Sequence, residues 1–343
     1  MKRSLLILLI LLMACTTSPA PEDISATAAA VPQGIPSSTP GQAATSTDTP
    51  TPRPSLTPPA TLTPVPSLTA TPLVPNFAHI VVLVFENKEY GTVIGNGSMP
   101  NYNQYAQSYT LLNAFFAVSH PSLPNYLAMM GGDTFGITSD CTRCFVDAQS
   151  LPDLIEQAGL TWRTYQERMP QPCFVGDTLL YAQKHNPFIY FTPIREDTAR
   201  CQTSIVPLTQ LDADMAANAL PNFVFITPDI CNDAHDCPVS TADAWLGDIM
   251  PKLQNFLDAS GQPYLIVLTW DEGQGDHSCC GLPEKAGGRI PVVLISPQVK
   301  TGFQDDTPYT HYSLLKTISA AWHLPYLGHA ADPENVLITA PWK

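Results

Sequence analysis

Residues 79–85 read HIVVLVF, and Glu86 and Asn87 follow them directly. An unbroken run of β-branched and other apolar residues is typical of a strand that is buried on both faces of a parallel sheet. Three more runs have the same character, at residues 222–226, 264–270 and 290–295. We therefore expect these four segments to be buried parallel strands.

Helical patterns lie between these runs. Residues 241–259 carry apolar side chains at helical spacing, and Gly261 follows as a stop signal. Residues 151–158 and 312–322 are two further predicted helices. Strands that alternate with helices predict an α/β fold, here a three-layer sandwich with a mainly parallel central sheet. Ligands of such sheets bind beyond the carboxyl ends of the strands, so the residues after each strand are the first candidates for a site.

The charge balance excludes one class of partner. The 343 residues include 16 Lys and Arg against 30 Asp and Glu, which gives a formal net charge of −14. A chain this acidic does not attract nucleic acid or an anionic membrane surface electrostatically. Its hydrophobic fraction of 44% provides enough apolar area for a large core.

The N-terminus predicts export. Lys2 and Arg3 precede an apolar run at 5–12 that is too short to span a bilayer but suits a signal peptide. Residues 12–15 read LMAC, which resembles a bacterial lipobox and implies cleavage before Cys15 and acylation of its thiol. This predicts an extracytoplasmic, membrane-anchored lipoprotein. Ordinary secretion with cleavage nearby is the alternative.

Three regions follow from this pattern. Residues 1–15 are the predicted lipoprotein signal, and residues 16–75 are a tract of Pro, Thr, Ser and Ala that holds 14 of the 35 prolines. Such a tract cannot bury enough apolar area to offset its ordering entropy, so we expect a disordered, extended linker. Residues 76–343 remain as the single folded domain.

Oxygen-rich clusters stand at the ends of three predicted strands. Glu86 and Asn87 follow the first, Asp271 and Glu272 follow another, and a third strand leads into residues 227–236, which contain several acids. Carboxylates crowded at the low-dielectric end of a sheet repel one another, and a bound cation relieves that repulsion. Oxygen ligands suit Mg²⁺, Mn²⁺ or Ca²⁺, and Zn²⁺ also accepts carboxylate. Each pair alone is also explained as a helix cap or a surface turn.

Ser122 is the candidate nucleophile. It lies in the segment 120–126, HPSLPNY, where it is placed to start a helix with Pro124 in the first turn. A helix N-terminus offers free N–H groups and the positive end of the helix dipole to a phosphate. A plain serine N-cap is the alternative.

Taken together, these segments resemble the phosphoesterase family of the alkaline phosphatase superfamily, which holds bacterial and fungal acid phosphatases and bacterial phospholipases C. The resemblance covers residues 78–325 and implies an alkaline-phosphatase-like fold. Six segments carry it in the family's order: Phe85-Glu86-Asn87, residues 120–126, Pro228-Asp229 through His235-Asp236, residues 269–273, Arg289-Ile290-Pro291, and residues 310–315.

The resemblance also implies roles for individual residues. Ser122 becomes the nucleophile, and one divalent cation, or two, becomes the cofactor. The implied metal ligands are Glu86, Asn87, Asp271 and Glu272, with Ser122 Oγ. His235 and His311 would contact the phosphoryl group or protonate the leaving oxygen. Substrate-binding or supporting positions are His120, Asn125, Asp229, Asp233 and His277. Three histidines outside the motifs receive no role: His185, His323 and His329.

Nine cysteines suggest disulfides in an exported chain. Without Cys15, eight remain, and eight cysteines allow 105 pairings. The expected pairs are Cys141–Cys144, Cys173–Cys201 and Cys231–Cys237, and a strained vicinal bridge between Cys279 and Cys280 is left open. A cysteine-based zinc site is the alternative, but the single CxxC has no second pair nearby.

Three functions follow from these features. The first is a metal-dependent phosphomonoesterase that acts on small phosphorylated substrates through a phosphoserine intermediate. The second is a phosphodiesterase or phospholipase C on the same fold. The third is a non-catalytic lipoprotein that binds phosphorylated ligands.

Overall fold

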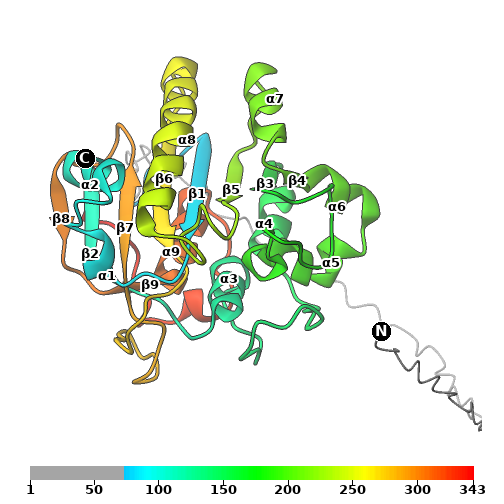
Figure 1. The fold of residues 1–343 in the computed structure, drawn as a ribbon, viewed down its shortest axis with the longest axis horizontal. Helices are drawn as coiled ribbons and strands as arrows, with labels where there is room; N and C mark the ends of the chain where they lie inside the picture. The colour runs from blue at the N-terminus through cyan, green and yellow to red at the C-terminus, as the bar shows by residue number, and fades with distance from the viewer. Residues whose placement is uncertain (1–72) are drawn as a thin grey trace, which may run out of the picture. The chain divides into compact units, whose positions relative to one another are not determined.

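A nine-stranded sheet lies at the centre of the computed structural model, which describes residues 73–343 (Figure 1). Its main order is β4-β3-β5-β1-β6-β7-β2-β8, and β9 pairs with β2. The strands are β1 His79–Phe85, β2 Thr110–Phe116, β3 Trp162–Gln166, β4 Ile205–Pro207, β5 Phe223–Thr227, β6 Tyr264–Trp270, β7 Arg289–Ile295, β8 Phe303–Asp305 and β9 Tyr309–Thr310.

β1 is a central strand of this sheet, as its unbroken apolar sequence predicts. All seven of its residues are buried. It pairs in parallel with β5 on one side and with β6 on the other. Residue 85 lies opposite residue 270, so the residues that follow β1 and β6 emerge side by side at the same edge of the sheet.

The expectation of four parallel strands is wrong for residues 290–295. This segment is β7, and it runs antiparallel to both β6 and β2. β7 is nevertheless almost fully buried. An unbroken apolar sequence reports burial on both faces, and it carries no information on strand direction. The other pairs within the sheet are parallel, so the predicted mainly parallel sheet is confirmed.

Helices cover both faces, which gives the three predicted layers. The connections β1→β2 and β5→β6 run across the sheet in one direction, whereas the connection β2→β3 runs back. Because such crossovers are right-handed, their helices lie on opposite faces. α2 packs on α8, which stands in front of the central strands in Figure 1, and α3 packs on α9. The helices are α1 Tyr90–Val93, α2 Pro100–Ser108, α3 Ser122–Gly131, α4 Leu151–Gln157, α5 Thr192–Arg195, α6 Thr198–Ser204, α7 Gln210–Ala216, α8 Val239–Ser260 and α9 His311–Ala321, with 3₁₀ turns at Gln183–His185, Pro187–Tyr190 and Gly328–Ala331.

The three predicted helices correspond to α4, α8 and α9. α8 ends at Gly261, which has a left-handed φ of 65°, as the stop signal indicated. β2, β3 and β4 were not predicted. β3 pairs with β4 and with β5, whose first residues, Ile205 and Phe223, lie about 40 to 60 residues further along the chain.

The three expected disulfides are present, Cys141–Cys144, Cys173–Cys201 and Cys231–Cys237, and so is the vicinal bridge Cys279–Cys280, which the sequence leaves open. The rival cysteine-based zinc site is therefore wrong, because these thiols are bonded to one another. Cys231–Cys237 closes the segment after β5, and Cys279–Cys280 lies in the loop between β6 and β7.

The predicted signal peptide, Cys15 and nearly all of the predicted linker lie outside the described residues. Within residues 73–343, no helix has both the length and the apolar character needed to cross a bilayer.

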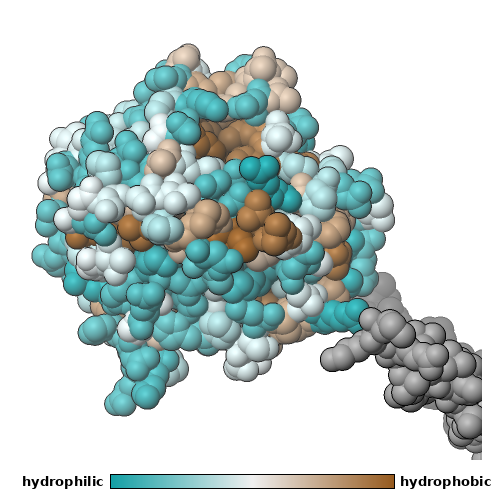
Figure 2. Space-filling model, in the orientation of Figure 1, coloured by the Kyte–Doolittle hydropathy of each residue, from teal (hydrophilic) through white to brown (hydrophobic). Residues whose placement is uncertain are grey.

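An apolar hollow opens between α7 and α8, at the top of the face shown in Figure 2. Its cavity of about 630 Å³ is lined by Leu211 and Met215 from α7 and by Trp245 and Ile249 from α8. Glu167 and Arg168, which follow β3, also line it.

Candidate active site and metal centre

Glu86 is the centre of the candidate site. It follows β1 directly, and its side chain is fully buried. Its Oε2 accepts hydrogen bonds from Ser122 Oγ at 3.1 Å and from Asn87 Nδ2 at 3.0 Å. Its Oε1 accepts one from the hydroxyl of Tyr126. The end of β1 and helix α3 therefore meet at this one carboxylate.

Ser122 is the first residue of α3, and the N-cap position is Pro121. Its hydroxyl makes no capping bond to its own helix. It donates instead toward Glu86 and, at 3.4 Å, toward Oε1 of Glu272. The alternative of a plain serine N-cap is therefore wrong, and a buried hydroxyl lies between two carboxylates.

Asp271 and Glu272 follow β6 and stand beside Glu86 because β1 and β6 pair in register. Oδ1 of Asp271 accepts a hydrogen bond from the backbone N–H of Asn87 at 2.9 Å. Oδ2 of Asp271 is buried and has no hydrogen-bond partner within residues 73–343. Asn87 has a positive φ of 58°, a conformation that asparagine tolerates better than most residues.

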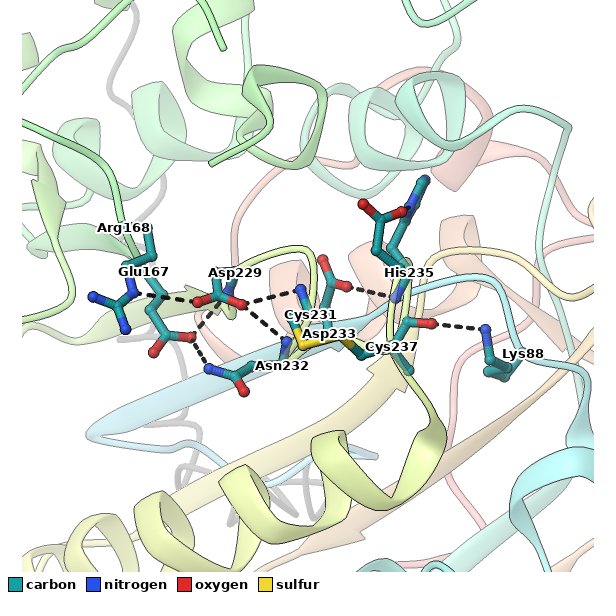
Figure 3. The surroundings of a disulfide bond; sticks show 11 residues. Lys88, Glu167, Arg168, Asp229, Cys231, Asn232, Asp233, His235 and Cys237 are labelled. Carbon is teal, nitrogen blue, oxygen red and sulfur yellow. Dashed lines mark hydrogen bonds and ion pairs between the residues drawn. A yellow bond between two sulfur atoms is a disulfide. The ribbon is translucent and has the colours of Figure 1, made fainter. Parts of the chain in front are cut away.

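The loop after β5 contributes Asp233 and His235 (Figure 3). Oδ1 of Asp233 accepts from the backbone N–H of His235 at 2.7 Å. Oδ2 of Asp233 lies 3.1 Å from Nδ1 of His185, and Nε2 of that ring lies 3.3 Å from Oε1 of Glu86. Ligand atoms of Glu86, His185 and His235 all lie within 4.8 Å of one another.

The buried carboxylates strongly perturb one another. Burial, followed by the charges of Asp271 and Asp233, raises the pKa of Glu86 well above its usual value. Burial and the charge of Glu272 raise the pKa of Asp271 to about 6. Burial raises the pKa of Asp233 to about 8. Burial and the charge of Lys184 lower the pKa of His185 to about 3, so this imidazole is neutral.

This donor set fits a divalent cation. Three carboxylates resist ionisation together, and one buried oxygen of Asp271 lacks a partner. A cation would favour the ionised carboxylates and use that oxygen. Carboxylate, amide and hydroxyl oxygens suit Mg²⁺, Mn²⁺ or Ca²⁺, and the neutral imidazoles nearby also suit Zn²⁺.

Two of the expected histidines lie beside the carboxylates. Nδ1 of His120 binds Oε2 of Glu272, and this hydrogen bond raises the pKa of His120 to about 9. His311 begins α9 and is buried, which lowers its pKa to about 4. Its Nε2 lies 2.6 Å from the backbone carbonyl of Asp271, and its Nδ1 has no partner among the described residues.

Three of the expected residues do not reach the carboxylate cluster. Asp229 binds the backbone N–H groups of Cys231 and Asn232 and lies 3.3 Å from Arg168, toward which it points in Figure 3. Asn125 holds the loop before α3, accepting from the N–H groups of Val118 and Ser119. The side chain of His277 is 74% exposed, and its Nδ1 lies 3.6 Å from Oε1 of Glu89.

Three residues at the site were missed by the sequence reasoning: His185, Lys184 and Tyr126. Tyr126 stands four residues after Ser122, which places both side chains on one face of α3. That spacing was a usable signal. His185 and Lys184 lie in a short 3₁₀ turn outside every motif, and no local pattern marks them.

Comparisons with known proteins agree with this geometry. A family model described as "Phosphoesterase family" matches residues 96–325. The phosphatidylinositol-3-phosphatase of Mycobacterium tuberculosis is 33% identical over 270 residues, which cover 77% of this chain and 83% of that protein. An acid phosphatase of Aspergillus fumigatus is 36% identical over 250 residues, which cover 69% of this chain and 54% of that protein. The chain thus spans most of the mycobacterial relative and about half of the fungal one.

A solved structure supports the fold. A Vibrio parahaemolyticus protein of the alkaline phosphatase superfamily has a TM-score of 0.52 at 12% identity, covering 76% of this chain and 71% of that chain. A likeness at this identity concerns the fold alone. It confirms the expected alkaline-phosphatase-like sandwich.

Proposed function

Because the chain belongs to the phosphoesterase family, we propose that it is a metal-dependent phosphomonoesterase with Ser122 as its nucleophile. The relatives that are named phosphatases confirm the coarser expectation of a phosphoric ester hydrolase. The observation that carries the finer proposal is the position of Ser122 Oγ, 3.1 Å from Glu86 and 3.4 Å from Glu272 at the start of a buried helix.

The proposed metal ligands are Glu86, Asn87, Asp271 and Glu272, together with Ser122 Oγ. When bound, the cation would favour the ionised hydroxyl and offset the negative charge of the phosphoryl oxygens. The ligands of a second cation would be Asp233, His185 and His235. We favour the single cation, because the ammonium of Lys184 already lies 3.2 Å from Nε2 of His235.

The chain's own residues supply the remaining steps. Ser122 Oγ passes its proton toward Oε2 of Glu86 and attacks phosphorus in line. The new O–P bond gives a phosphoserine, and the bond to the alcohol oxygen breaks. We assign protonation of that oxygen to the imidazolium form of His235, whose Nδ1 is held by Asp236 at 2.7 Å. This requires the ammonium of Lys184, which lies 3.2 Å from Nε2 of His235, to move off that nitrogen so that Nε2 can carry the proton. Water then hydrolyses the phosphoserine, and phosphate leaves.

The structure suggests supporting roles for the other two histidines. The Nε2 of His311 is committed to the backbone of Asp271, so this residue positions Asp271 and does not need to touch the substrate. His120 holds Glu272 through its Nδ1 and meets the carbonyl of Gly275 through its Nε2 at 3.1 Å. Both histidines therefore fix the segment that carries two proposed ligands.

The proposed substrate class is a small phosphomonoester. The two relatives, one a phosphatidylinositol-3-phosphatase and the other an acid phosphatase, both have names that specify phosphatase activity. A phosphodiesterase or phospholipase C remains the competing function. Hydrolysis of p-nitrophenyl phosphate compared with p-nitrophenyl phosphorylcholine separates the two.

The decisive experiment measures p-nitrophenyl phosphate hydrolysis by the full chain before and after EDTA treatment, and again after each divalent metal is added back. We expect EDTA to abolish turnover and Ser122→Ala to reduce kcat by at least about 1,000-fold. Ser98→Ala, at an exposed serine before α2, is the matched control and keeps full activity. Turnover that survives in Ser122→Ala would disprove the nucleophile.

We also propose that residues 76–343 are the catalytic domain, that residues 16–75 form a spacer, and that the mature protein is a lipoprotein anchored through Cys15 outside the cytoplasmic membrane. The four disulfides support an oxidising compartment. Cys15→Ser is expected to move the protein from the membrane fraction to the soluble fraction. Continued membrane association of that variant would rule out the anchor.

A further inference from the structure

The ammonium of Lys184 lies at the edge of the candidate site. Its Nζ donates to Oδ2 of Asp140 at 2.8 Å and lies 3.2 Å from Nε2 of His235. The Lys184 side chain is only 19% exposed. The hydrogen bond to the Asp140 carboxylate favours the charged ammonium. The site therefore contains a positive charge that the reaction as described does not use.

The other carboxylate oxygen of Asp140 binds the backbone next to the proposed nucleophile. Oδ1 of Asp140 accepts a hydrogen bond at 3.0 Å from the backbone N–H of Leu123, the residue that follows Ser122. This N–H belongs to the first turn of α3, a ten-residue helix, and is one of the free donors that a helix N-terminus offers to an anion. The carboxylate of Asp140 thus bridges an ammonium and a helix N-terminus next to Ser122.

We propose that Lys184 is the substrate-binding cation that selects the dianion of a phosphomonoester, and that a phosphoryl oxygen replaces Asp140 on Lys184 and on the N–H of Leu123. This inference rests on the proposed function and deepens it, since it assigns the preference for monoesters to one residue. A dianion gains more from a neighbouring ammonium than the single charge of a diester does. A phosphoryl group also presents the same kind of oxygen acceptor as the carboxylate that it displaces.

The position of Lys184 also explains why we favour one divalent cation over two at the site. The ammonium stands beside His235, whose ring belongs to the group of ligand atoms that a second metal would use. An ammonium and a divalent cation repel each other at such a separation. Lys184 therefore supplies the second positive charge. The other nearby lysine is committed elsewhere, because Nζ of Lys88 donates to the backbone carbonyl of Ala234 at 2.8 Å.

The test compares Lys184→Gln with the wild-type full chain, both loaded with metal, on p-nitrophenyl phosphate and on bis-p-nitrophenyl phosphate. We expect kcat/KM for the monoester to fall by about 10- to 100-fold, the range for loss of one charged hydrogen bond. The kcat/KM for the diester should change by less than about 3-fold, because the single charge of a diester gains less from the ammonium. Lys184→Arg keeps the charge and restores most of the monoester activity. Lys252→Gln, at an exposed lysine of α8, is the matched control and changes neither value.

Binding of inorganic phosphate gives a second readout that does not depend on turnover. Phosphate should raise the unfolding temperature of the wild-type protein and raise it less in Lys184→Gln. Asp140→Asn replaces the competing carboxylate with a neutral amide, so phosphate should bind this variant about 3- to 10-fold more tightly, on the scale of one weakened charge interaction.

The outcomes separate the two proposals. Suppose that the wild-type enzyme hydrolyses the monoester, and that Lys184→Gln lowers kcat/KM equally for both substrates or for neither. Lys184 then does not select the dianion, while the proposed function stands. If the wild-type enzyme hydrolyses neither substrate, the proposed function fails, and phosphate binding still decides the role of Lys184. Weaker phosphate binding by Asp140→Asn would overturn the proposal that a phosphoryl oxygen replaces the carboxylate of Asp140.

Discussion

Nδ1 of His185 lies 3.1 Å from Oδ2 of Asp233, and both side chains are buried beneath the candidate metal site. The opposite ring nitrogen lies 3.3 Å from Glu86. The neutral imidazole therefore packs between the loop after β5 and the end of β1, and it stacks on Tyr126 with ring centroids 5.6 Å apart. No motif in the sequence assigns this histidine a role.

Replacing His185 should weaken the metal site. In His185→Ala, the ring that packs between Asp233 and Glu86 is lost, so we expect apparent metal affinity to fall by about 10- to 100-fold, the usual cost of removing a supporting side chain beside a metal site. Activity titrated against the metal is the measurement, with circular dichroism to verify folding. His323→Asn, at an exposed histidine with a left-handed φ that asparagine tolerates, is the control. Unchanged metal affinity in His185→Ala would contradict the prediction.

Glu89 should position the loop that carries Asp271 and Glu272. Its carboxylate accepts hydrogen bonds from the backbone N–H groups of Gln274 and Gly275, both at 3.0 Å, and of Arg289 at 3.1 Å. Glu89→Gln offers only one acceptor oxygen in place of two. We expect kcat/KM to fall by about 10-fold, consistent with the loss of one hydrogen bond to a charged group.

The control for Glu89 is Glu284→Gln, an exposed glutamate in the same loop, which should leave kcat/KM unchanged. Both variants are compared on the same substrate at saturating metal. Equal activity of the two variants would show that the three backbone bonds of Glu89 do not govern the position of the ligands.

The metal-free protein should lose stability as the pH rises from about 6.5 to 8. Asp233, with a folded pKa of about 8 against an ordinary value of 3.8, keeps its proton in the folded state and loses it in the unfolded state. His120, with a folded pKa of about 9 against 6.5, behaves in the same way in this window. The folded state binds more protons than the unfolded state, so the free energy of unfolding falls with rising pH. His185 and His311, with folded pKa values of about 3 and about 4, oppose this trend near pH 6.5, where their unfolded forms are half protonated, and the opposition fades as the pH rises.

Thermal unfolding of the EDTA-treated full chain at several pH values tests this. We expect the unfolding temperature to fall by several degrees across the window, and a divalent metal to restore it. Asp233→Asn should flatten the dependence on pH, because the titrating group is gone. An unfolding temperature that rises with pH in the metal-free protein would contradict the prediction.

The disulfide Cys231–Cys237 should protect the arrangement of Asp233 and His235, which it encloses. A Cys231→Ala/Cys237→Ala double variant is expected to raise KM and to lower the free energy of unfolding by about 2 kcal/mol, a typical value for one disulfide. The double variant at Cys173 and Cys201, neither of which adjoins a proposed site residue in the sequence, serves as the comparison. If both double variants lose activity to the same extent, the Cys231–Cys237 bridge has no special role at the site.

The central fold was predictable where burial is continuous along the sequence. β1, β5 and β6 show their burial in consecutive apolar residues, and α8 shows it in helical spacing with a terminal glycine. The direction of β7 was not predictable, because burial on both faces looks the same in a parallel and an antiparallel strand. The short β4 has only three residues, too few for any periodicity.

The candidate site was predictable to the extent that its residues follow strands. Glu86 and Asp271 come together because β1 and β6 are neighbours in register, and this follows from ordinary sheet geometry. His185 and Lys184 come together with them through contacts that span about 50 to 100 residues. Such contacts depend on how separate segments pack, and no local pattern of residue types encodes them.

One feature of the loop between β6 and β7 constrains how this protein can diverge. A Cβ atom added at Gly273 or Gly288 would stand 2.2 or 2.8 Å from Oε2 of Glu89, and one at Gly275 would stand 3.3 Å away. At Gly273 a larger side chain is therefore tolerated only when residue 89 becomes shorter, so we expect positions 273 and 89 to co-vary across related chains. Gly288 stays glycine whatever stands at position 89, because its φ of 83° is positive and its Cβ would also meet the backbone oxygen of Gly275 at 2.7 Å.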